Sequence, residues 1–171
     1  MTIAALLLAL AGTLPGWFLS DRDRAHLLGS VLGAAVLVGL GGWTLYDPSY
    51  AAHDDALRGT LTILTAMLAA FGGGPVTAAV LHRVDNGGPV EQAGDVLRGG
   101  AWIGAMERIA IFATLVAGWP EGLAIVLAMK GLGRYPELKQ PGAAERFIIG
   151  SFTSVLWAIA CAAVLYGLLN S

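Results

Sequence analysis

Six long apolar runs, joined by short connections that carry most of the charge, constrain the fold of this 171-residue chain more than any other feature. Hydrophobic residues make up 56% of the sequence and charged residues 13%, against about a quarter charged in an ordinary soluble domain. Long apolar stretches are typical of helices that cross a bilayer. The pattern predicts one all-α, polytopic membrane domain over residues 1–171, with runs at Thr2–Leu19, Leu27–Tyr46, Thr60–Leu81, Ala101–Gly118, Gly122–Gly133 and Phe147–Leu169.

The fifth run, Gly122–Gly133, is short for a complete span. To cross, it must borrow residues from the next connection, or lie where the bilayer is thinned. It could instead enter and leave on the same side. Two arrangements therefore stay open: a bundle of six transmembrane helices, or five helices plus a re-entrant segment at residues 122–134.

Basic residues are distributed unevenly between the connections, which predicts the orientation. The connections after the second and fourth runs contain only Arg58. Because Lys and Arg accumulate on the cytoplasmic side of a membrane, we expect both termini to face outward from the cytoplasmic membrane. A re-entrant fifth run would move the C-terminus inside. The basic residues on the predicted inner side are Arg22, Arg24, Arg83, Arg98, Arg134, Lys139 and Arg146.

Two adjacent ionisable residues, Glu107 and Arg108, interrupt the fourth run. The motif GWPEG joins the fourth and fifth runs as a tight turn, and equal rises from that turn place Lys130 level with Glu107. Adjacent helix residues point about 100° apart. We therefore expect Glu107 to meet Lys130 or Arg146, and Arg108 to meet Glu145 or a ligand. The predicted cluster comprises Glu107, Arg108, Lys130, Arg134, Glu145 and Arg146.

The charged cluster has three interpretations. It can be an ion-pair network that holds three helices in register. It can also bind an anion, because its four basic residues exceed its two acidic residues by two positive charges. Such a pocket at the inner leaflet would attract a phosphate head group or a phosphorylated metabolite. A proton or ion relay through Glu107 is the third interpretation.

The motif FGGGPV lies inside the third run and predicts a kink or break at Gly72, Gly73, Gly74 and Pro75. Proline lacks an N–H group, and glycine weakens a helical turn. The irregularity is either purely structural or a substrate site, since freed backbone groups of broken helices can coordinate ligands.

Small residues at helical spacing predict close helix contacts. The longest such stripe consists of Gly150, Ser154, Ala158 and Ala162 in the last run. Small side chains let helix backbones approach closely, which favours helix association in lipid. Trp157 lies in the middle of the same run, and we expect it to pack inside the bundle.

Several function classes lack a signal in this sequence. The net charge of −2 gives no reason to expect nucleic-acid binding, and a single cysteine excludes an intrachain disulfide. No Walker loop, dinucleotide fingerprint, G-x-S-x-G or H-E-x-x-H motif occurs. We predict no metal site and no cofactor, and an enzymatic function is disfavoured.

The segments WIGAMER, AMKGLGRY and AERFIIGSFTS, within residues 101–158, resemble a family of small bacterial inner-membrane proteins of uncharacterised activity. The shared pattern is W-I-G-x-x-E-R, then an Ala and a Lys with an Arg nearby, then a Glu that opens the final helix. Where the pattern has a small hydroxyl residue after the Lys, this chain has Gly131. The resemblance implies a bacterial inner-membrane location.

These observations favour a non-enzymatic integral membrane protein. We expect a structural or accessory subunit that self-associates or docks a membrane-protein partner, in contact with membrane lipid. The first alternative is a small transporter or binding component for an anionic solute or a phospholipid head group. The second is an intramembrane enzyme that acts on a phosphorylated lipid.

Overall fold

The computed structural model describes residues 2–13, 33–40, 42–43, 54–84, 100–139 and 142–170. Every regular element in these ranges is a helix, and these ranges contain no strand. The predicted all-α class is therefore confirmed. The six-span bundle stays a prediction, because two of the described helices are long and apolar enough to cross a membrane.

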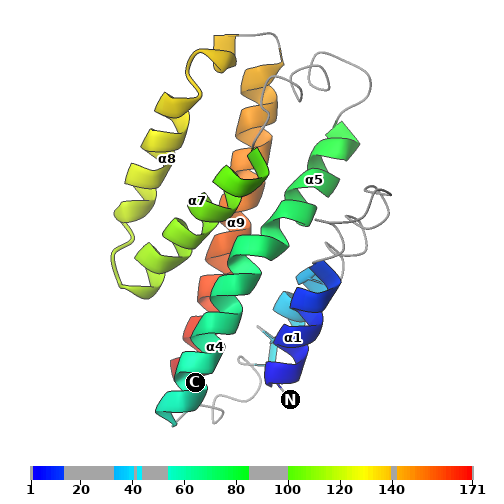
Figure 1. Ribbon diagram of the computed structural model, residues 1–171, viewed down its shortest axis with the longest axis vertical. Helices are drawn as coiled ribbons and strands as arrows, with labels where there is room; N and C mark the ends of the chain where they lie inside the picture. The colour runs from blue at the N-terminus through cyan, green and yellow to red at the C-terminus, as the bar shows by residue number, and fades with distance from the viewer. Residues whose placement is uncertain are drawn as a thin grey trace.

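The first of these two helices is continuous over Asp55–Val84. It consists of α4 (Asp55–Met67), the π-helical turn η1 (Leu68–Gly72) and α5 (Gly73–Val84). The second is α9 (Ala143–Asn170), which lies beside α5 and runs in the opposite direction (Figure 1). Their 30 and 28 residues exceed the roughly 20 that a hydrocarbon core of about 30 Å requires.

The remaining described helices are shorter. They are α1 (Thr2–Thr13), a helical stretch at residues 33–40, α7 (Gly100–Val116), α8 (Gly122–Gly133) and the short 3-10 helix η2 (Glu137–Lys139). The first two predicted runs lie partly outside the described residues. With 12 residues, α8 extends about 18 Å, which is less than a full hydrocarbon core. Both predicted arrangements of the fifth run therefore remain open.

A tight turn joins α7 to α8, as the GWPEG motif predicts. Gly118 has a φ of 71°, and the N–H of Trp119 donates to Thr114 O at 2.8 Å. The N–H of Gly118 donates to Leu115 O at 3.1 Å. This pair of bonds is the Schellman motif, which ends a helix with a left-handed glycine. The two helices pack as an antiparallel hairpin (Figure 1).

The small-residue stripe of α9 packs inside the chain. Ser154, Ala158 and Ala162 are buried, and α9 packs mainly against α5 and α7. A Cβ atom added to Gly150 would lie 3.5 Å from Leu81 of α5, which is an ordinary contact. The predicted close helix contacts of this stripe are therefore made with helices of the same chain.

Arg58, the only basic residue in the predicted outer connections, ties two helix ends together. Its Nη1 donates to Leu169 O at 3.2 Å, in the last turn of α9. Carbonyl groups in the last turn of a helix lack intrahelical donors, and a cation is favourable there. The start of α4 and the end of α9 therefore lie at the same end of the bundle (Figure 1).

The buried stripe predicts a position-specific response to added volume. Ala158→Leu should lower the free energy of unfolding by about 1–3 kcal/mol, because Ala158 is fully buried and its neighbours must move apart. Ala163→Leu is the matched control, because Ala163 is exposed on the same helix. Chemical unfolding in detergent micelles measures both. Equal losses in the two variants would contradict this packing.

Candidate functional site

The site is built around a defect in the backbone of the long helix. Pro75 is buried and follows η1 by three residues. Its missing N–H would serve the carbonyl of Phe71 in an α-helical turn, or that of Ala70 in a π-helical turn. At least one carbonyl in this stretch therefore has no backbone donor. An unsatisfied carbonyl is costly in an apolar interior.

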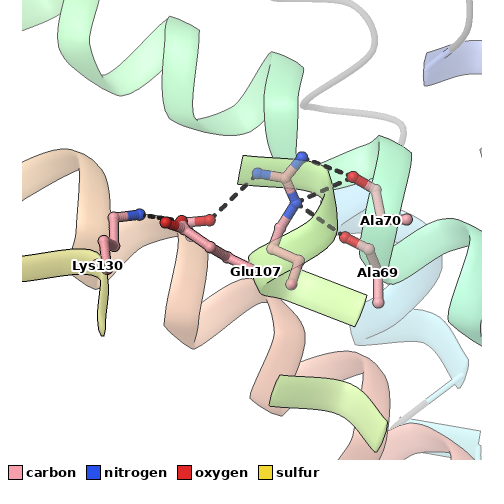
Figure 2. A network of polar contacts seen from close by, with 6 residues as sticks. Ala69, Ala70, Glu107 and Lys130 are labelled. Atoms are coloured by element: carbon pink, nitrogen blue, oxygen red, sulfur yellow. Dashed lines mark hydrogen bonds and ion pairs between the residues drawn. The ribbon is translucent and has the colours of Figure 1, made fainter. Parts of the chain in front are cut away.

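Arg108, on α7, supplies donors to this stretch. Its Nε donates to Ala69 O and Ala70 O, both at 3.0 Å, and its Nη2 donates to Ala70 O at 2.6 Å (Figure 2). Its Nη1 donates to Ser154 Oγ, on α9, at 3.1 Å. The side chain is 3% exposed. One guanidinium therefore connects α7 to η1 and to α9.

Trp157, on α9, supplies another donor. Its indole Nε1 donates to Leu68 O at 3.0 Å, and the residue is 6% exposed. Trp157 thus packs inside the bundle, as predicted from its position. Three successive carbonyls of η1 receive side-chain hydrogen bonds from two other helices, so the irregular turn is satisfied from outside its own helix.

Glycines give these two side chains access to the backbone. A Cβ atom on Gly72 would lie 2.7 Å from Trp157 Cζ2, and one on Gly73 would lie 2.5 Å from Arg108 Cδ. Both distances are too short for a real Cβ atom, so a residue larger than glycine at either position would displace its neighbour. The sequence predicts a kink or break at Gly72–Pro75, but the helix changes its hydrogen-bond register just before it, at Leu68–Gly72, and continues without a break through Pro75.

An ion pair joins the α7–α8 hairpin next to this network. Lys130 Nζ donates to Glu107 Oε2, and the two side chains are 17% and 14% exposed. The ammonium also lies 5.8 Å from the ring centroid of Phe147, on α9, within the range of a cation–π interaction. In Figure 2, Glu107 and Lys130 lie on one side of the network and Ala69 and Ala70 on the other.

The other predicted cluster residues lie at the ends of helices. Arg134 follows α8, and Glu145 and Arg146 lie in the first turn of α9. Glu145 is exposed. The expectation that Arg108 meets Glu145 is wrong, because the guanidinium turns inward to the carbonyls of η1. In the described part of the chain, the structure brings together Glu107, Arg108 and Lys130.

Sequence reasoning missed the acceptors of Arg108 and the role of Trp157. The acceptors are backbone carbonyls of Leu68–Gly72, and a backbone carbonyl has no residue-type signature. The signal that points to them is Pro75, because it marks the upstream carbonyls that need a donor from elsewhere. Arg108 and Trp157 are the strong donors that the neighbouring helices place within reach.

Comparison with known protein families, characterised proteins and solved structures found no match to this chain. The resemblance of residues 101–158 to small bacterial inner-membrane proteins therefore stays an expectation.

Replacing Arg108 with Lys tests the planar geometry of the donor. The ammonium cannot serve Ala69, Ala70 and Ser154 together from one position, so Arg108→Lys should lower the free energy of unfolding by about 2 kcal/mol. Arg83→Lys is the control, because Arg83 is exposed at the end of α5. Denaturant unfolding in micelles measures the difference. An effect of Arg108→Lys no larger than that of the control would contradict the assignment.

A double-mutant cycle tests the hairpin ion pair. Glu107→Gln and Lys130→Met should each destabilise the protein, because each leaves one largely buried charge without its partner. The loss in free energy of unfolding of the double variant should be smaller than the sum of the two single losses, by about 1–3 kcal/mol. Additive losses would show that the two side chains do not interact in the folded protein.

Proposed function

We propose that this chain is a non-enzymatic integral membrane protein that acts as a structural or accessory subunit and docks a membrane partner. The observation that supports the proposal most strongly is the internal use of its buried polar groups. Arg108 binds carbonyls of η1, and Glu107 pairs with Lys130. These groups therefore contribute to the scaffold that holds α5, α7, α8 and α9 together.

The exterior of the bundle supports a docking role. Large apolar side chains recur at helical spacing on the outer faces of three helices and need cover from lipid or protein. On α8, the exposed fractions of Ile125, Met129 and Leu132 are 51%, 70% and 75%. The corresponding exposed residues are Trp102, Met106 and Ile109 on α7, and Ile148, Phe152 and Leu156 on α9.

The α8 stripe (Ile125, Met129 and Leu132) is the best candidate for the docking face. Figure 1 shows α8 at the edge of the bundle, beside α7. Its length of about 18 Å would leave at least one end of the helix within the depth of a bilayer. Backbone groups at such an end require protein or a water-filled cavity around them. A partner helix would provide that cover, whereas lipid chains would not.

The charge distribution supports an orientation for this membrane protein. Arg83, Arg134, Lys139 and Arg146 lie toward the end of the bundle where α9 begins, and Arg58 lies at the opposite end (Figure 1). By the positive-inside rule, the end with four basic residues faces the cytoplasm. We propose a bacterial cytoplasmic membrane, six spans and outward termini.

The two alternatives have less support from this geometry. A phosphorylated solute or lipid head group needs direct access to a cation, and Arg108 is 3% exposed. An intramembrane enzyme needs a reactive group that faces its substrate. In the described residues, Glu107 already engages Lys130.

Photo-crosslinking at Met129 tests the docking face. A photoreactive amino acid at this position, in native membranes, should give one discrete protein–protein adduct, and the mass of the adduct distinguishes a second copy from a different partner. Ile63 on α4 is the matched control, because it is apolar and 62% exposed. Its probe should label lipid. Exclusive lipid labelling from Met129 would contradict the docking proposal.

A further inference from the structure

Two hydroxyl groups behave differently from the other hydroxyls of this bundle. Threonine hydroxyls in its helices donate back to a carbonyl of the same helix three or four residues earlier, as at Thr60, Thr62, Thr65, Thr114 and Thr153. Thr77 Oγ1 and Ser151 Oγ are buried and have no hydrogen-bond partner within the described ranges. A buried hydroxyl without a partner is destabilising, so these two groups need an explanation.

Ser151 faces the region of the buried charges. Phe147, Ser151 and Ser154 recur at positions i, i+4 and i+7 of α9 and therefore share one face. Phe147 lies near Lys130, and Ser154 accepts a hydrogen bond from Arg108. Ser151 lies between them and is 8% exposed. Its hydroxyl is thus placed at the contact of α9 with α7.

Thr77 lies on α5 at the same level. It follows Gly73, against which Arg108 packs, by one helical turn. Its Cγ2 lies 3.7 Å from the position of a Cβ added to Gly150. A Cβ added to Gly104 would meet only Arg108 within 4 Å, with Nη1 at 3.1 Å. Thr77 thus lies one turn along α5 from the glycine against which Arg108 packs, and Ser151 lies three residues along α9 from Ser154, which accepts from Arg108.

The charge balance of this region is positive. Arg108 and Lys130 carry two positive charges against one negative charge on Glu107, which is the only carboxylate paired with either of them in the described part of the chain. Arg108 has five N–H groups, of which three donate to Ala69, Ala70 and Ser154. The remaining two have no acceptor among the described residues. A buried charge that lacks a counter-ion is costly in an apolar interior.

We propose that a small monovalent anion of the size of chloride binds between α5, α7 and α9. The two remaining N–H groups of Arg108 and the hydroxyls of Thr77 and Ser151 donate to it. Two N–H groups and two O–H groups can all donate to an anion, and its charge cancels the surplus positive charge, which a water molecule cannot do. This ion is a structural counter-ion, and its binding does not depend on the docking role proposed above.

The test uses the full-length protein in detergent, with chloride exchanged for the bulky anion gluconate at constant ionic strength. The Tm should rise saturably with chloride and with bromide, by about 3 °C at ten times the half-saturating concentration. In the variant that combines Thr77→Val and Ser151→Ala, the half-saturating concentration should increase at least tenfold. Thr65→Val should leave it unchanged, because the Thr65 hydroxyl already bonds within its own helix.

The same experiment contains the results that would overturn the proposal. Equal Tm values in chloride and gluconate would show that the region holds water or no ligand. An unchanged half-saturating concentration in the double variant would place the anion elsewhere. The double variant should fold, because its substitutions remove hydroxyls that lack a partner, and its Tm in gluconate should equal or exceed that of the unaltered protein.

Discussion

The carbonyl groups that precede Pro75 need hydrogen-bond donors from outside their own helix, and the rest of the structure depends on that need. Arg108 and Trp157 provide the donors, and Gly72 and Gly73 leave room for these two side chains. Glu107, the neighbour of Arg108 on α7, interacts electrostatically with the buried guanidinium. Glu107 in turn pairs with Lys130 and so fixes α8 against α7. The irregular turn that precedes Pro75 is thus connected, through Arg108, Trp157 and the Glu107–Lys130 pair, to three other helices.

This chain of requirements favours a scaffold over a reaction centre. Arg108 and Trp157 donate to carbonyls of the bundle's own backbone, and the small-residue stripe of α9 is covered by α5 and α7. Among the described residues, large apolar side chains are exposed on α7, α8 and α9, and we propose the α8 stripe as the docking face. A counter-ion beside Arg108 would complete the interior and would leave that exterior unchanged.

The sequence predicted what depends on local geometry and on residue type. It predicted the all-helical class, the long runs behind Asp55–Val84 and α9, and the tight turn that brings Lys130 level with Glu107. It could not predict the partners of Arg108, because backbone carbonyls 38 and 39 residues away in sequence carry no signature. Nor could spacing alone decide whether the α9 stripe packs within the chain or between chains. The span count depends partly on residues outside the described ranges.

A double-mutant cycle between Pro75→Ala and Arg108→Met tests the central claim most directly. Alanine restores the missing N–H, so the carbonyls of η1 regain a backbone donor and depend less on the guanidinium. Arg108→Met should lower the free energy of unfolding in both backgrounds. The account predicts that this loss is smaller in the Pro75→Ala background than in the unaltered chain, by at least about 1 kcal/mol. Losses that agree within about 0.5 kcal/mol in the two backgrounds would contradict it.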